Sequence, residues 1–247
     1  MYVQLVFCVL ASTPAAQGLE IAKRIDAANS GYRSERAVMQ MKLINAHGDE
    51  TLRRMNSITQ EQPDDGDRSK LEFLWPADVK GTRMLTWSHK SENDDQWLYL
   101  PALSRVKRIS SRGQSGSFMG SEFAYEDLGS QEIEKYTYSY VGEQTVDDRK
   151  VWVIDRFPVR KSGYSRLRTY NDQGYMNAVK VEYFDRKGEL LKTARFFEFK
   201  KIGAFWRASR IHMVNHQTQK QSELIWSERK LGVPVDDDAF DVDSLED

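Results

Sequence analysis

A period of two residues governs most of the chain: from Ala37 to Ser227, short runs of alternating apolar and polar residues are separated by turn residues. Val181, for example, lies between Lys180 and Glu182. This alternation is typical of β-strands with one buried face, and closely spaced turns join such strands into antiparallel hairpins. The pattern predicts strands at residues 37–44, 52–59, 71–75, 82–89, 136–141, 151–156, 165–170, 178–184, 190–200, 208–215 and 222–227. We therefore expect a mainly β protein built on a single curved antiparallel sheet.

One amphipathic helix precedes the strands. Apolar residues recur at near-helical spacing from Leu19 to Ala28, and the helix is expected to end near residues 29–31. Upstream, residues 2–11 form an apolar run of signal-peptide length, followed by small residues that resemble a cleavage region. We expect a signal peptide, cropped because no Lys or Arg precedes the run, at residues 1–17; a loose amino-terminal strand is the alternative. Residues 18–247 contain no repeat or long linker and are expected to form a single domain.

Composition argues against several classes of function. The chain has 36 basic and 37 acidic residues and a formal net charge of -1, whereas nucleic-acid binding usually requires a clear basic excess. The single cysteine, Cys8, lies in the amino-terminal apolar run, so a mature chain would have no thiol for a disulfide, for catalysis or for a metal. We expect no nucleic-acid partner and no cofactor.

The titratable residues form no recognisable catalytic or metal-binding pattern. His212 and His216 fall in or near a strand, where four residues span roughly 13 Å, and no glutamate completes a metalloprotease motif. Residues 113–116 lack the spacing of a nucleophile elbow. The pairs Glu132 with Glu134 and Asp147 with Asp148 are ordinary features of loops and strand edges. We therefore expect a protein that is not an enzyme, with no catalytic residue and no metal ligand.

A single curved sheet must bury its concave apolar face against other elements. The helical material that the sequence predicts is limited to the first helix, part of residues 117–128 and a short tail near residues 237–240. This shortage leaves room for a ligand cavity, although a well-packed sandwich of two sheets would give the same alternation.

The stretch at residues 94–128 combines aromatic anchors, a basic strand and a glycine-framed apolar tip. Three runs within it, DQWLYLPAL from Asp95, VKRI from Val106 and GSFMGSEFAYEDL from Gly116, resemble the LolA-like outer membrane lipoprotein-sorting protein family, in the broad branch whose genes often accompany RND-type exporters. The likeness extends more loosely over nearly all of the chain after the predicted signal peptide.

This resemblance implies a LolA-like fold, an incomplete β-barrel covered by an N-terminal helix and by short helices or loops. It also implies a cavity for acyl chains and a location in the periplasm of a Gram-negative cell envelope. No motif in this chain matches the functional arginine of the dedicated lipoprotein carriers.

The candidate site residues come from the same stretch and its neighbouring strands. Phe118 and Met119, between Gly116 and Gly120, are expected to form either a mobile cavity mouth or a buried loop anchor. The full set of candidates for lipid contact, each of which is alternatively plain core, is Trp75, Met84, Trp87, Trp97, Tyr99, Phe118, Met119 and Phe123.

Arg105, Lys107 and Arg108 are candidates for contact with lipid head groups or a membrane partner. The alternatives are a solvated strand face, or a structural clamp in which Glu126 and Asp127 pair with this basic group.

The function favoured by the sequence is a periplasmic, non-enzymatic chaperone for the acyl chains of lipids or lipoproteins, working as a monomer with an inner-membrane RND-type exporter. One alternative is a lipid-sensing or interaction module that regulates a membrane partner. A weaker alternative is a lipid hydrolase.

Overall fold

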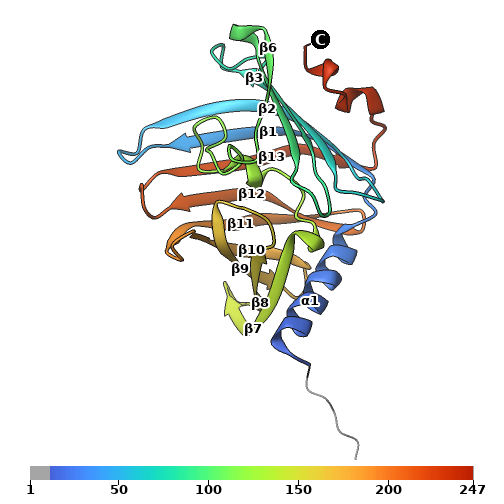
Figure 1. Cartoon of the computed structure of the whole chain (residues 1–247), viewed down its shortest axis with the longest axis vertical. Coiled ribbons are helices and arrows are strands. Elements are labelled where there is room, and N and C mark those ends of the chain that lie inside the picture. The colour runs from blue at the N-terminus through green and yellow to red at the C-terminus, as the bar shows by residue number, and fades with distance from the viewer. Residues whose placement is uncertain (1–11, 247) are drawn as a thin grey trace, which may run out of the picture.

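The computed structural model describes residues 12–246, which form one helix, α1 (Pro14–Asn29), thirteen strands and several 3-10 turns (Figure 1). The strands are β1 (Ser34–Ile44), β2 (Glu50–Gln60), β3 (Arg68–Trp75), β4 (Arg83–Trp87), β5 (Asp95–Leu100), β6 (Arg105–Arg108), β7 (Tyr136–Val146), β8 (Arg149–Pro158), β9 (Tyr164–Asp172), β10 (Asn177–Asp185), β11 (Leu190–Ile202), β12 (Phe205–Asn215) and β13 (Gln221–Leu231).

All thirteen strands belong to one antiparallel sheet with the order β6-β5-β4-β3-β2-β1-β13-β12-β11-β10-β9-β8-β7. The first and last strands pair at the centre of the sheet, where Met39 lies opposite Trp226. Two meanders therefore run outward from this central pair, and β6 and β7 form the two edges. Residues 109–135 connect these edges, so this segment must cross from one end of the sheet to the other (Figure 1). We call residues 109–135 the cover.

Helix α1 packs along the β7 edge of the sheet (Figure 1). The Thr13 hydroxyl accepts a hydrogen bond from the Ala16 amide at 3.2 Å, and Pro14 occupies the first turn, as expected for a capped helix start. Gly18 makes the close approach possible, because a Cβ there would lie 2.9 Å from the Tyr140 backbone nitrogen. The buried face, with Ile21, then packs against β7 and β8.

The sheet buries apolar side chains on both faces. On the concave face the main core contains the fully buried Met41, Met55, Phe73 and Met213. On the opposite face, the tail that follows β13 inserts Phe240 and Leu245 against Leu85 of β4. The Trp87 indole nitrogen donates to the Phe240 carbonyl at 2.8 Å, which fixes this tail against the sheet.

The strand predictions are confirmed: every predicted strand matches an observed one to within a few residues. The single open sheet is also confirmed, and the sandwich alternative is wrong, because one sheet contains every described strand. The helix begins at Pro14, inside the segment predicted to be removed as a signal peptide. The apolar run at residues 2–11 lies outside the described residues, so the signal peptide and the division at residue 17 stay predictions. No helix among residues 12–246 is long and apolar enough to span a membrane.

Candidate ligand cavity

The cover is attached to the concave face by its apolar tip. Phe118 is 0% exposed, and its ring centroid lies 5.9 Å from that of Phe73 and 5.6 Å from that of Tyr125. The guanidinium group of Arg53, on β2, donates a hydrogen bond to the Met119 carbonyl. The tip is therefore a buried anchor in this structure.

A buried ion pair attaches the middle of the cover to the opposite half of the sheet. The Lys192 ammonium of β11 lies 2.6 Å from an Asp127 carboxylate oxygen, with side-chain exposures of 4% and 5%. The ammonium also donates to the Glu122 carbonyl at 2.8 Å, and the Tyr164 hydroxyl donates to Asp127 at 2.8 Å. Burial, together with the nearby Asp127 charge, raises the pKa of Tyr164 well above its ordinary value, so this phenol stays a donor.

Beneath the cover, a cavity of about 380 Å³ lies between α1, the cover and the inward-facing side chains of β7 to β12. Its volume is within the usual range of small-molecule pockets, roughly 300–1,000 Å³. Most of the lining is apolar or aromatic, and includes Ala22, Ile25, Phe123, Ile133, Tyr136, Tyr138, Ile154, Leu167, Val181, Tyr183, Phe196 and Ile211.

The cavity also contains a few polar groups. Burial raises the pKa of the Asp26 carboxyl, and nearby Glu134 adds to this effect. Burial likewise raises the pKa of Glu126, although hydrogen bonds from the Ser162 hydroxyl and the Gly163 amide oppose the shift. Arg156 is the cation among the lining residues. Its guanidinium lies 4.8 Å from the centroid of the Tyr136 ring.

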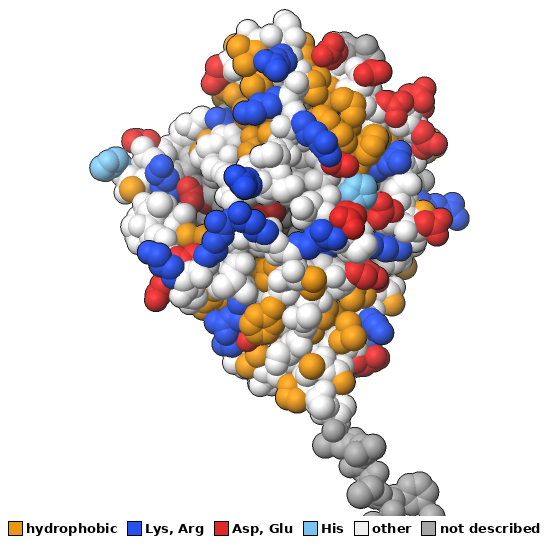
Figure 2. Space-filling view, in the orientation of Figure 1, with side chains coloured by type: hydrophobic (Ala, Val, Ile, Leu, Met, Phe, Trp, Pro, Cys, Tyr) orange, Lys and Arg blue, Asp and Glu red, His pale blue; other side chains and the backbone are white. Residues whose placement is uncertain are grey.

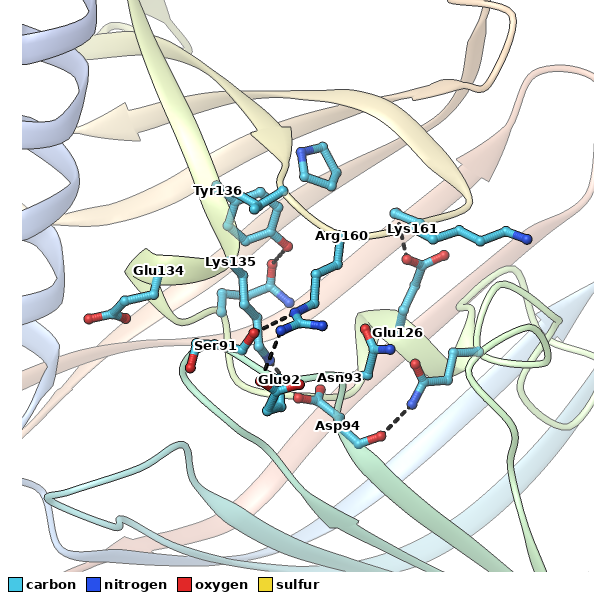
Figure 3. A pocket seen from close by; sticks show the side chains of 15 residues that line it. Ser91, Glu92, Asn93, Asp94, Glu126, Glu134, Lys135, Tyr136, Arg160 and Lys161 are labelled. Carbon is cyan, nitrogen blue, oxygen red and sulfur yellow. Dashed lines mark hydrogen bonds and ion pairs between the residues drawn. The ribbon is translucent and has the colours of Figure 1, made fainter.

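A smaller polar pocket of about 90 Å³ adjoins the cavity and shares Glu126, Gln131 and Tyr136 with it. It lies between the cover, the β4–β5 loop and the β8–β9 loop (Figure 3). Arg160 from the β8–β9 loop donates to Glu92 of the β4–β5 loop at 2.9 Å. The Lys135 ammonium of the cover lies 2.7 Å from Asp94. Charged groups from three segments therefore meet at one end of the apolar cavity.

The molecular surface also separates apolar from charged side chains. In the view of Figure 2, hydrophobic side chains gather near the β3–β6 end and near α1 and β7, and Lys and Arg side chains run between them.

The structure places the eight predicted lipid-contact residues in three regions. Met84, Phe118, Met119 and Phe123 belong to the concave core or pack against it. Trp87, Trp97 and Tyr99 lie on the opposite face beneath the C-terminal tail. Trp75, at the end of β3, is 51% exposed.

Of these eight residues, only Phe123 lines the cavity. Strand alternation explains Trp87: it lies two residues after Leu85 and points with it to the face opposite Met84. Met84, Phe118 and Met119 are on the concave side, but they belong to its packed core and not to the cavity between α1, the cover and β7 to β12. Alternation alone does not reveal which face is concave, nor that the tail covers the other one.

The three basic candidates, Arg105, Lys107 and Arg108, are exposed on the edge strand β6. Arg108 pairs with Asp95 on β5. The predicted clamp between this group and Glu126 and Asp127 is wrong, because both acids bind elsewhere: Asp127 pairs with Lys192, and Glu126 accepts from Ser162 and Gly163.

Sequence reasoning missed most of the cavity wall, including Tyr138, Ile154, Arg156, Leu167 and Tyr183. Each of these residues lies in a predicted strand, so the period of two was visible. One signal was available in the sequence: Arg156 is charged, yet it lies two residues from the apolar Ile154 and therefore on the same face of the strand.

The two histidines have separate hydrogen-bond partners, His212 with Gln221 and His216 with Thr193. Residues 12–246 hold no group of three His, Cys, Asp or Glu arranged to bind a metal.

Comparisons with known proteins agree with this geometry. A family model that carries the description "Uncharacterized protein" matches residues 65–247. A domain from Vibrio parahaemolyticus named for outer membrane lipoprotein sorting is 43% identical, with a TM-score of 0.92 over 94% of this chain and 100% of that chain. A DUF1329 family protein from Desulfovibrio piger is 26% identical, with a TM-score of 0.91 over 95% of this chain and 100% of that chain.

A LolA superfamily protein from Nitrosomonas europaea is 21% identical and shares the fold, with a TM-score of 0.74 over 95% of this chain and 100% of that chain. A search of curated proteins found no significant match. The open antiparallel sheet, its edge helix and the cavity beside them define a half-barrel protein of the LolA type. The chain belongs to the LolA-like outer membrane lipoprotein-sorting protein family, as its motifs indicated.

Proposed function

We propose that this protein is a periplasmic, non-enzymatic carrier that holds an acyl chain of a lipid or lipoprotein in the cavity beneath the cover. The observation that carries the proposal is the apolar wall formed by α1 and strands β7 to β12 around a space of about 380 Å³. The sorting role in the name of the Vibrio parahaemolyticus relative supports it.

Transfer of hydrocarbon from water to this wall supplies the binding energy, at about 0.8 kcal/mol for each buried methylene group. Phe123 of the cover and Ile154 and Leu167 of the sheet are the contacts we assign to the chain. The remaining seven sequence candidates do not line this space, and we assign them to the surrounding core and surface.

Release requires the cover to move, since it contributes Phe123 and Ile133 to the cavity wall. The buried Lys192–Asp127 pair opposes this movement. A carrier of this kind would deliver its cargo where an acceptor offers the acyl chain a better site. We propose that the exposed Arg105, Lys107 and Arg108 on β6 contact an anionic membrane or a membrane partner such as an RND-type exporter.

The test is purification from the periplasm, followed by mass spectrometry of extracted lipid and a transfer assay to acceptor vesicles. We expect co-purified acyl lipid that moves to the vesicles. A pure protein with no lipid and no affinity for acyl probes would exclude a carrier. Lipid that binds and is never transferred would instead favour a lipid-sensing module that regulates a membrane protein.

A further inference from the structure

Arg156 is placed unlike the other cations of the core. It lies on β8, opposite Tyr138 of β7 and Leu167 of β9, and points to the concave side with Ile154. Its guanidinium lies over the Tyr136 ring and also interacts electrostatically with the phenol groups of Tyr138 and Tyr183.

The Nε atom of Arg156 is buried and has no hydrogen-bond partner among the described residues. The Nε atoms of Arg53, Arg210 and Arg229 are in the same state. Each of those three guanidinium groups nevertheless donates to an oxygen through a terminal nitrogen, which Arg156 does not.

Other cations of the sheet that are buried or partly buried have oxygen partners. Lys192 pairs with Asp127 at 2.6 Å, and Arg229 lies 3.0 Å from Glu35. On the outward face next to Arg156, Arg168 binds Asp155 at 2.7 Å. Arg156 is partly exposed, but burying its Nε–H without an acceptor is unfavourable, because this donor loses water and gains nothing in exchange. An acceptor supplied by a ligand would remove this cost.

The carboxyl groups that share the cavity do not neutralise Arg156. Asp127 is held by Lys192 and Tyr164, and Glu126 is held by Ser162 and Gly163. Burial raises the pKa values of Glu126 and Asp26.

We propose that Arg156 binds the oxyanion of a single-chain anionic amphiphile, a carboxylate or phosphate whose acyl chain lies against Ile154 and Leu167. This inference rests on the proposed function and adds to it the class of ligand. The planar guanidinium offers two parallel donors to either oxyanion, and binding would complete the unsatisfied Nε–H. The volume of about 380 Å³, near the lower end of ligand pockets, favours one chain over two.

The experiment compares three ligands of equal chain length by isothermal titration: palmitic acid, palmitoyl lysophosphatidic acid and uncharged hexadecanol. We expect the wild-type protein to bind at least one of the two anions about 10- to 100-fold more tightly than the alcohol, as a charge-assisted hydrogen bond predicts. The anion that binds more tightly identifies the preferred head group, a carboxylate or a phosphate.

Arg156→Gln should reduce the affinity for both anions to that for hexadecanol, and it should leave the affinity for hexadecanol unchanged. The matched control is Arg160→Gln, which should keep the preference for anions. Arg160 lies four residues after Arg156, in the polar pocket, and pairs with Glu92. The three-ligand comparison on the wild-type protein needs no variant, so the proposal remains testable if Arg156→Gln does not fold.

Equal binding of all three ligands to the wild-type protein would overturn the role of Arg156 while acyl binding stands. The same conclusion would follow if Arg156→Gln kept the preference for anions. Binding of none of the three would overturn both this inference and the acyl carrier.

Discussion

The Lys192 ammonium on β11 lies 2.6 Å from the Asp127 carboxylate of the cover, and water reaches almost none of either side chain. This pair joins the cover to the half of the sheet that forms the cavity, across 65 residues of sequence. A charge buried this deeply is tolerated only with its partner in place. This attachment of the cover to β11 therefore depends on two side chains.

Lys192→Met should destabilise the protein by about 3–5 kcal/mol, because it leaves the Asp127 carboxylate buried without its cation. Urea unfolding measures this change. The control is Arg195→Met on the same strand, whose exposed pair with Asp147 should contribute less than about 1 kcal/mol. Equal losses for the two variants would show that the buried pair does not hold the cover.

The stability of the protein should fall as the pH rises from about 4 to about 6, because burial raises the pKa of Asp67 to about 6 from an ordinary value of 3.8. In this window the unfolded chain has lost the Asp67 proton and the folded chain retains it, so ionisation favours unfolding. The effect amounts to roughly 3 kcal/mol at most.

Asp67→Asn should remove this pH dependence and keep the hydrogen bond from the Tyr32 hydroxyl, which is 2.6 Å long in the wild-type protein. Urea unfolding between pH 4 and pH 8 measures it. Asp64→Asn, in the exposed part of the same loop, should behave as the wild type. A pH profile of Asp67→Asn that parallels the wild type would contradict the assignment.

Phe118→Ala should cost about 3–5 kcal/mol of stability, since it removes a fully buried ring from the concave core. Acyl affinity, measured by titration with a fluorescent fatty acid at a temperature where the variant is folded, should change little because Phe118 does not line the cavity. Met119→Ala, at a half-buried position, should cost less. A loss of affinity with stability intact would instead identify the tip as a cavity mouth.

Phe240→Ala should release the C-terminal tail from β4 at a cost of about 3–4 kcal/mol, because the ring is 0% exposed. Trp87, which donates to the Phe240 carbonyl, should then become exposed, and its fluorescence should shift to the red. Asp238→Ala, an exposed change in the same turn, should stay within about 0.5 kcal/mol of the wild type. An unchanged emission spectrum for Phe240→Ala would argue against this packing.

The strands could be predicted from the sequence because each one records its two environments in alternate residues, as Lys180, Val181 and Glu182 do. The single sheet followed from the short turns. The helix followed from its apolar periodicity, and the family likeness added that it covers a half-barrel with a cavity for acyl chains. The structure confirms a half-barrel with a helix at one edge.

The location of the cavity could not be predicted, because it depends on contacts between distant segments. Trp97 and Leu98 are neighbours in β5, yet the first meets the C-terminal tail and the second the concave core. The sequence around these two residues does not show which of them faces the tail and which faces the concave core. Likewise, the partner of Asp127 is Lys192, and no spacing rule connects two residues that meet only after the sheet has curved.

The pairing of β1 with β13 at the middle of the sheet has a consequence for biogenesis. The Ser227 hydroxyl reaches the Val38 carbonyl across 189 residues of chain, so the centre of the sheet is joined by contacts between residues far apart in sequence. Each meander can form its own hairpins early, but β1 keeps an unpaired edge until the last strand arrives. A folding chain therefore exposes a strand edge of the kind that promotes aggregation until β13 pairs with β1.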